Sequence, residues 1–358
     1  MRFGISIYLG LELSDAEQRA LLRLASARGV TRLFTSLHLP ETKPESFITE
    51  ARTLLQAARD FGFDIIADVS PAALKTLGLE RFEADAFAAF GICTLRLDDG
   101  FSPAEIARFS HNAVGLRLQL NASTLSQSDL DELKSSGADF SHLDALHNFY
   151  PRPGTGLSLA FFRQQNDMLR QYGLSVGAFI PSSARRRAPL HAGLPTLEFH
   201  REMPISLAAR HLAALGVESI FIGDECPSEE ELSQLTATEP DIIGLRAQLF
   251  PAGKPLREFL QQPFTARPDV ARDAIRTLES RERSRRLSPI VSANTVARPY
   301  GAVTLDNREY PRYAGELQII KRPQPADPRT NVIARIVPEE YFLLPLITAG
   351  KKFTFYFE

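Results

Sequence analysis

The sequence has little of what marks a secreted or membrane-bound protein. Its 358 residues include only two cysteines, Cys93 and Cys226, which lie too far apart to suggest a disulfide framework. No run approaches the roughly 18 apolar residues that a membrane-spanning helix needs. No signal-peptide pattern precedes the first strand-like segment. We therefore expect a cytoplasmic protein with no membrane partner.

A strong excess of charge of one sign is missing as well. The 41 Lys and Arg residues and the 43 Asp and Glu residues leave a formal net charge of −2. This balance excludes a global basic field that would attract nucleic acid. The arginine-rich stretch 276–286 has no interleaved aromatic residues to stack on bases, so we interpret it as an exposed face. We predict no nucleic-acid partner, and any anionic ligand must be bound by a local group of cations.

Motifs for familiar cofactors are also missing. There is no glycine-rich GxGxxG or GxxxxGK[ST] loop for a nucleotide, and no lysine at a predicted strand end for a Schiff base. His142 and Asp144 alternate on one predicted strand, but no third or fourth metal ligand accompanies them. We predict neither a cofactor nor a metal.

Short apolar runs, by contrast, recur evenly through the first two thirds of the chain. They cover residues 3–8, 30–37, 64–70, 94–99, 115–121, 140–146, 174–181 and 219–224, and helix-like segments separate them. In the first of these segments Ser14 and Glu17 match a capping box and Gly29 matches a helix stop. The alternation predicts an α/β fold, a (β/α)8 TIM barrel. An open doubly wound sheet is the alternative.

The pattern changes near residue 238. Helical periodicity fades, prolines become frequent, and residues 300–307, 315–322, 331–337 and 351–358 look like strands. We predict a barrel domain over residues 1–238 and a small β domain over residues 239–358.

Polar residues gather where the predicted strands end, which is where TIM barrels hold their active sites. Asp68 and Asp98 end two neighbouring strands. Two such carboxyl groups can divide the work of glycoside cleavage, one as proton donor and one ionised. The alternative is that each caps the following helix or pairs with an arginine such as Arg96.

Two segments are predicted to be binding loops. In HNFYPRPGTGLS, residues 147–158, Pro151 and Pro153 restrict the backbone beside Arg152, so the polar groups are held in fixed directions. The segment 184–201 is too long and too rich in Arg, His and Pro for a plain connection. Its arginines could bind a phosphate, as this fold often does near its seventh and eighth strands. A surface loop with ordinary ion pairs is the alternative.

Taken together and in order, these motifs resemble a known family. FTSLHLPE, IADVSP, LRLDDGFS, LQLNAST, HNFYPRPGTGLS, GLPTLEFHR and FIGDE resemble the bacterial 6-phospho-N-acetylmuramidases. YGAVTLDNREYPRYAGELQI and NVIARIV resemble the cyclophilin-like C-terminal domain of that family. The resemblance implies a TIM barrel followed by a cyclophilin-like β domain. It also implies a cytoplasmic enzyme that cleaves N-acetylmuramic acid 6-phosphate from N-acetylglucosamine during recycling of cell-wall disaccharides.

The resemblance also implies a catalytic pair. Asp68 and Asp98 are the first candidates, with Glu198 and Glu41 in reserve. The 2-acetamido carbonyl of the substrate could itself be the nucleophile, with one Asp orienting it; a covalent aspartyl intermediate is the alternative. Another sugar-phosphate enzyme, an epimerase or lyase, and a non-catalytic sugar-phosphate sensor remain alternative functions.

A larger set is expected to bind the phosphorylated disaccharide. Arg152 and Thr155 are expected on anionic or hydroxyl groups, and Arg298 of the β domain is expected to complete an anion clamp. The β domain could instead only stabilise the barrel or mediate contacts in a homodimer. The substrate-binding candidates are Glu41, Asn121, His147, Asn148, Tyr150, Arg152, Thr155, Gly156, Arg187, His200, Arg201 and Arg298.

Overall fold

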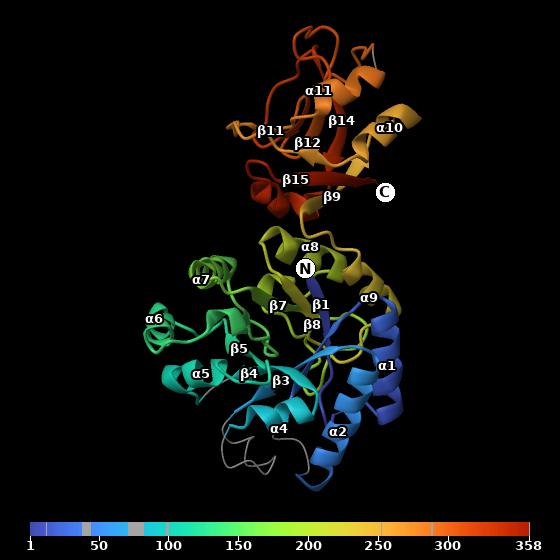
Figure 1. Cartoon of the computed structure of the whole chain (residues 1–358). Helices are drawn as coiled ribbons and strands as arrows, with labels where there is room; N and C mark the ends of the chain where they lie inside the picture. The colour runs from blue at the N-terminus through green and yellow to red at the C-terminus, as the bar shows by residue number, and fades with distance from the viewer. Residues whose placement is uncertain are drawn as a thin grey trace. The chain divides into compact units, whose positions relative to one another are not determined.

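The computed structural model describes residues 1–11, 13–37, 44–70, 82–97, 100–251, 253–287 and 289–357. The chain divides into two compact units (Figure 1). The first comprises Met1–Leu212 and Val217–Thr238, and the second comprises Ala213–Gly216 and Glu239–Glu358.

The first unit is a closed barrel of parallel strands with helices between them, so the prediction of a TIM barrel is confirmed. The strands, in order around the barrel, are β1 (Arg2–Ser6), β2 (Arg32–Ser36), β3 (Asp64–Val69), β4 (Ile92–Leu97), β5 (Arg117–Asn121), β6 (Leu143–Leu146), β7 (Val176–Ile180) and β8 (Ser219–Ile222). The helices among the described residues are α1 (Asp15–Ala27), α2 (Pro44–Asp60), α4 (Ala84–Ala89), α5 (Pro103–Ser110), α6 (Gln127–Ser135), α7 (Leu159–Gln171), α8 (Ile205–Ala214) and α9 (Glu229–Thr236).

Capping boxes define where several of the barrel helices begin. The hydroxyl of Ser14 accepts the N–H of Glu17, whose carboxylate accepts the N–H of Ser14, as the sequence predicted. Gly29 follows the end of this helix with a φ of 84°, a conformation that favours glycine. Ser102, Ser126 and Ser228 form the same reciprocal box at the starts of α5, α6 and α9. Each box fixes the point at which a loop from a strand end enters its helix.

An aromatic cluster fills the barrel interior. Tyr8, Phe34, Phe179 and Phe221 are each 2 % exposed or less, and Phe149 packs against them. The rings of Phe34 and Phe149 each meet that of Phe179 edge to face, with centroids 5.2 Å apart. The polar groups at the strand ends therefore lie next to tightly packed aromatic rings.

The second unit is a curled, mixed β sheet, which confirms the prediction of a small β domain after the barrel. Its strand order is β10 (Phe264–Thr265), β15 (Lys352–Phe357), β9 (Ile242–Leu249), β14 (Thr330–Ile336), β12 (Ala302–Asp306), β13 (Leu317–Ile320) and β11 (Ala274–Arg276). Only β9 and β15 pair in parallel among these neighbours. The helices α10 (Lys254–Leu260) and α11 (Ser280–Arg283) and the 3-10 turns η3 (Ser284–Leu287) and η4 (Pro338–Leu346) complete it.

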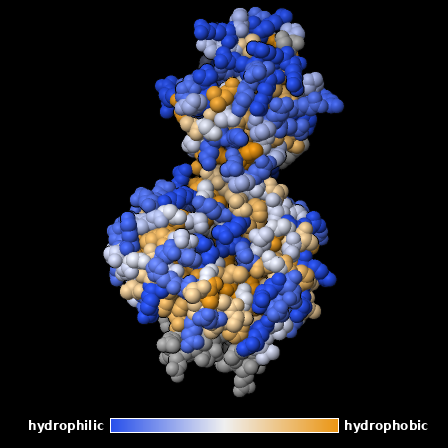
Figure 2. Space-filling model, in the orientation of Figure 1, coloured by the Kyte–Doolittle hydropathy of each residue, from blue (hydrophilic) through white to orange (hydrophobic). Residues whose placement is uncertain are grey.

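The surface of this unit agrees with the interpretation of its charged stretch. Arg281, Arg285 and Arg286 are exposed, and hydrophilic side chains cover most of the face of the β domain that Figure 2 shows. Across the described part of the chain, no helix combines the length and apolar character required to cross a bilayer.

We expect the barrel interior to reject a side chain at Gly4. A Cβ atom there would lie 2.2 Å from Cδ1 of Phe221, so Gly4→Ala should lower the free energy of unfolding of the barrel by about 1 to 3 kcal/mol. The control is Gly253→Ala, because Gly253 has a φ of −69° and its added Cβ would meet nothing closer than 3.6 Å. Urea denaturation of both variants checks this. Equal stability of the two would contradict the tight packing.

Candidate functional site

Polar side chains from three strand ends meet at the carboxyl side of the barrel. Arg96 of β4 donates from Nη1 to Oδ1 of Asp68 on β3 over 2.7 Å, and from Nη2 to Oδ1 of Asn148, just after β6. The Arg96 side chain is 4 % exposed and that of Asp68 is 16 % exposed. The pairing of Asp68 with Arg96, which the sequence left as an alternative, is therefore present, and the carboxylate is the more accessible partner.

A buried chain of hydrogen bonds orients Asn148. His147 lies within 2.8 Å of Oδ1 of Asn166 through Nε2 and within 3.1 Å of the Ser123 hydroxyl through Nδ1. That hydroxyl accepts the backbone N–H of Asn148. Burial lowers the pKa of His147 to about 4, so the ring is neutral, and this network assigns its proton to Nε2. His147 is fully buried, and it helps to fix the backbone of Asn148 through the Ser123 hydroxyl.

The two predicted binding loops are tied together by a carboxylate. Glu198 accepts the N–H groups of Gly154 and Gly156 at 2.9 and 2.7 Å. It also accepts two N–H groups of Arg201, both at 2.7 Å. Bonding to Arg201, the largest cause, lowers the pKa of Glu198 to about 2. A Cβ on Gly156 would lie 2.6 Å from this carboxylate, so the approach requires glycine.

Arg201 extends the same connection. Its guanidinium donates to the carbonyl oxygens of Tyr150 and Arg152 in one loop and of Ala192 and Gly193 in the other. The contacts of Glu198 and Arg201 thus lie within the protein and join residues 150–156 to residues 192–201.

Two other candidates also have their polar groups bonded to other groups of the protein. The hydroxyl of Thr155 donates to the carbonyl of Arg152 at 2.6 Å, closing a local turn. His200 is fully buried and meets His211 of α8 at 2.8 Å. Burial lowers the pKa of both histidines, so the pair is neutral near pH 7. Neither Thr155 nor His200 joins the group around Asp68 in the contacts described here.

The three consecutive arginines after β7 have different surroundings. Arg186 binds Glu202 with both terminal nitrogens, at 2.9 and 2.7 Å. Arg185 lies at the exposed side, 3.9 Å from Glu17. These two contacts match the ordinary ion pairs that the sequence left as the alternative for this loop.

Arg187 differs from both neighbours. Its guanidinium carbon lies 4.4 Å from the ring centre of Tyr8 and 5.2 Å from that of Phe149. Its Nε and Nη1 atoms are buried and have no hydrogen-bond partner among the described residues. This guanidinium therefore lies over the aromatic core with two buried donors that no described residue satisfies.

Arg187 is held in place by a residue that was not among the site residues predicted from the sequence. Asp224, just after β8, is fully buried and accepts the backbone N–H groups of Arg187, Ser182 and Leu194 at 2.8 to 3.2 Å. Burial raises the pKa of Asp224. The FIGDE motif was the available signal, but sequence alone does not show that its acid binds backbone and not a ligand.

Other candidates have contacts of their own or lie outside the described residues. Glu41 and Asp98 belong to segments that the structure does not describe. Asn121 ends β5, and its Oδ1 accepts the N–H of Ser123. Arg298 belongs to the second unit, where it donates to the carbonyl of Pro325.

No metal centre is visible in the described segments, where no three His, Cys, Asp or Glu side chains gather in a way that could hold an ion. His142 contacts Asp139 at 2.8 Å, and Asp144 accepts a hydrogen bond from Gln119 at 2.9 Å. The two residues that came closest to a metal motif thus have separate partners.

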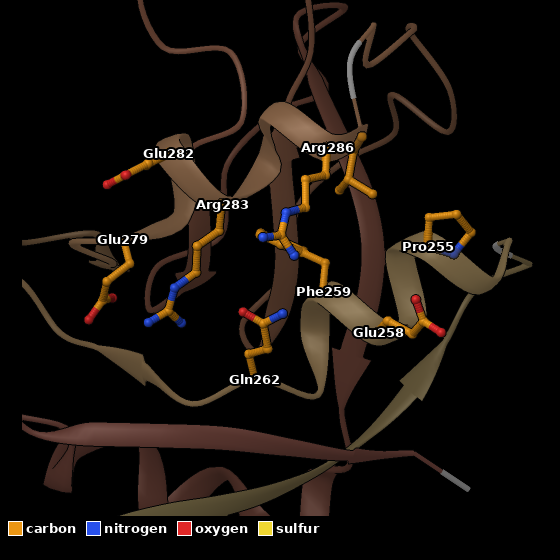
Figure 3. Close-up of a pocket in the computed structure, with 9 residues that line it drawn as sticks. Pro255, Glu258, Phe259, Gln262, Glu279, Glu282, Arg283 and Arg286 are labelled. Carbon is orange, nitrogen blue, oxygen red and sulfur yellow. The ribbon is translucent and has the colours of Figure 1, made fainter.

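The β domain has a hollow of about 530 Å³ of its own (Figure 3). In this view the Arg283 guanidinium lies between Glu279 and Gln262, and the Arg286 guanidinium lies near Gln262. Arg283 also donates to the carbonyl of Pro263. Carboxylates outnumber the arginines of this hollow, since its lining includes Glu258, Glu279 and Glu282. It is poorly suited to a strongly anionic ligand.

The fold of the first unit is a TIM barrel, and comparison with known families defines the class of protein. Residues 3–237 match the family described as 6-phospho-N-acetylmuramidase, N-terminal, and residues 246–356 match 6-phospho-N-acetylmuramidase, C-terminal. The chain belongs to this family of glycosidases, which act on phosphorylated muramyl sugars. The resemblance inferred from the motifs is confirmed.

Two solved structures are similar over nearly their whole length. An uncharacterized B. cereus protein is 30% identical, with 99% of each chain covered and a TM-score of 0.88. A conserved Enterococcus faecalis protein of unknown function is 35% identical, with 100% of this chain and 97% of that chain covered and a TM-score of 0.71. No curated protein matches the chain.

The connection between the two loops should weaken in acid. Because the folded-state pKa of Glu198 is lowered from 4.5 to about 2, its contribution to stability is complete above pH 4.5. It is lost as the pH falls toward 2. The stability difference between the wild type and Glu198→Gln should shrink over the same range, as measured by urea denaturation at several pH values. Glu230→Gln on exposed α9 is the control; a difference that is constant with pH would refute the assignment.

Proposed function

We propose that this protein hydrolyses the glycosidic bond between N-acetylmuramic acid 6-phosphate and N-acetylglucosamine, in the recycling of cell-wall sugars. One observation carries the proposal: the partly exposed carboxylate of Asp68, held by Arg96 at the strand ends. Family membership supports the substrate class. The neighbouring donors of Arg187 support an anionic group on that substrate.

Asp68 is proposed as the carboxylate that remains ionised. An arginine at 2.7 Å favours the charged form of a carboxyl group. Arg96 also donates to Asn148. The two contacts together hold its guanidinium in place beside Asp68. A fixed negative charge can stabilise the positive charge that develops on the sugar ring as the bond breaks.

The proton donor is proposed to be Asp98, which follows directly after β4 in the sequence. A glycosidase needs a second carboxyl group that is protonated before the reaction and gives its proton to the leaving oxygen. Glu198 fits that role poorly, because its pKa of about 2 keeps it ionised. We propose that Glu198 positions the loops instead.

Arg187 is proposed as the main group that binds the phosphate. Of the three consecutive arginines, Arg186 is paired with Glu202 and Arg185 lies near Glu17. Only Arg187 combines an aromatic platform with buried donors that lack a partner among the described residues. A phosphate would satisfy both donors through charge-assisted hydrogen bonds.

The remaining candidates divide into two proposed groups. Direct contacts are proposed for residues near the loop surface and strand ends: Asn121, Asn148, Tyr150 and Arg152, with Glu41 and Arg298 as further candidates. A positioning role is proposed for those whose polar groups are engaged within the protein: His147, Thr155, Gly156, His200 and Arg201.

The direct test is incubation of the protein with the 6-phosphorylated disaccharide and, separately, with the unphosphorylated one. The proposal expects two monosaccharides from the first substrate and far less from the second. Binding of the phosphorylated disaccharide without cleavage would favour a sensor and overturn the hydrolase.

Asp68→Asn should lower kcat by about 100-fold or more, because the amide keeps the shape of the side chain and removes its charge. Substrate affinity should change little. Steady-state kinetics checks this, with Asp167→Asn on exposed α7 as control. Turnover close to that of the wild type would remove Asp68 from the catalytic pair.

Arg187→Ala should weaken binding of the phosphorylated substrate by about 2 to 4 kcal/mol, given the strength of charge-assisted hydrogen bonds. Affinity for a neutral analogue should remain nearly constant. Titration calorimetry with both ligands measures this, and Arg185→Ala is the matched control two residues away. Equal losses of affinity for both ligands would show that Arg187 stabilises the loop and does not bind the phosphate.

A further inference from the structure

The opposite end of the barrel carries a second concentration of positive charge. Arg2, Arg32 and Arg117 begin β1, β2 and β5, and Arg59 lies in the last turn of α2. These four arginines line one hollow of about 600 Å³ at the amino ends of the strands. This is the end that TIM barrels do not use for catalysis.

Arg32 is the most enclosed of the four. It is 1 % exposed, yet its Nε atom has no hydrogen-bond partner among the described residues. Its Nη1 donates to the Ser219 hydroxyl at 3.0 Å, and its Nη2 lies 3.7 Å from Oδ2 of Asp144. Burial lowers the pKa of Arg32 to about 10. The Arg32 guanidinium is therefore shielded from water, while one of its N–H groups has no hydrogen-bond partner among the described residues.

Negative charge is scarce around this hollow. Asp144 is shared by Arg32 and, at 3.8 Å, by Arg2. Arg117 donates only to backbone carbonyl oxygens, and neither Arg117 nor Arg59 forms an ion pair with a described residue. Asp64 is the one acid in the lining of the hollow. Asp144 lies outside the lining and contacts Arg2 and Arg32, so four arginines are matched by two aspartates. The excess is two positive charges.

A glycine helps to form the hollow. Gly91, before β4, has a φ of 82°, and a Cβ there would lie 2.1 Å from Cδ of Arg59. The missing side chain therefore lets Arg59 lie across the start of β4. Both the backbone conformation and the close approach favour glycine at this position.

We propose that this hollow binds a phosphoryl dianion, at a site separate from the strand-end site. A dianion matches the excess of two charges, and its oxygens accept hydrogen bonds from guanidinium groups. The volume also admits a phosphate monoester, so the ligand is inorganic phosphate or the phosphoryl group of a sugar phosphate. Binding there would add negative charge beside Arg32, which shares Asp144 with Arg2.

Cys93 supplies a local reporter for this site. It is exposed and lines the same hollow, beside Gly91. The other cysteine, Cys226, follows β8 at the opposite end of the barrel, so Cys226→Ser leaves one thiol that reports on the proposed site alone. A change in the labelling of Cys93 is therefore independent of binding near Arg187.

The experiment compares labelling of Cys93 by dianionic 5,5′-dithiobis(2-nitrobenzoate) and by neutral iodoacetamide in the Cys226→Ser protein. Inorganic phosphate should slow the dianionic reagent in a saturable way, while sodium chloride at equal ionic strength should slow it less, through screening only. Arg59→Gln should weaken the apparent phosphate affinity about tenfold, which corresponds to one charge-assisted contact. Arg23→Gln, on exposed α1, should leave that affinity unchanged.

Equal slowing by phosphate and chloride, or the same phosphate affinity in Arg59→Gln as in the parent, would overturn the site. Glucose 6-phosphate distinguishes the two sources of the ligand. If glucose 6-phosphate protects Cys93 at a concentration similar to that of phosphate, the ligand is a phosphate monoester. If it protects Cys93 more weakly, the ligand is inorganic phosphate. Arg32 is left intact because its replacement would disturb the barrel. The outcome does not depend on whether the protein cleaves the disaccharide.

Discussion

The ion pair of Glu198 and Arg201 is the interaction on which the candidate site depends most. Two loops that are separate in sequence approach each other because this carboxylate and this guanidinium bond to the backbones of both. A pair that is mostly shielded and fully hydrogen-bonded specifies one arrangement, since moving either loop would leave charged groups unsatisfied. Asn148 and Arg187 each precede, by a few residues, one of the two segments that are joined in this way.

Neighbouring residues of the same type have different roles because the fold exposes them differently. Arg186 is satisfied by Glu202, while Arg187 lies over Tyr8 and Phe149. Its direction follows from the backbone contact with Asp224. Selectivity for an anion in a nearly neutral protein thus requires one oriented cation, without a general excess of positive charge.

Much of the fold could be predicted from the sequence because its signals are local. The apolar runs repeat, and Ser14, Glu17 and Gly29 mark the limits of a helix within a few residues. The site was less predictable, since the direction of a side chain depends on contacts that are distant in sequence. His147 and His200 follow strand and loop motifs rich in polar residues, yet both are buried against helices.

The capping boxes of the barrel helices indicate where a loop can be exchanged. Ser102, Ser126 and Ser228 each form their capping box with a residue of the same helix. The start of each helix is therefore defined without a contact from the preceding loop. The loop between Asp224 and Ser228 can be exchanged without removing β8, the cap or the acid that holds Arg187. These serines are natural junctions for grafting new specificities onto the scaffold.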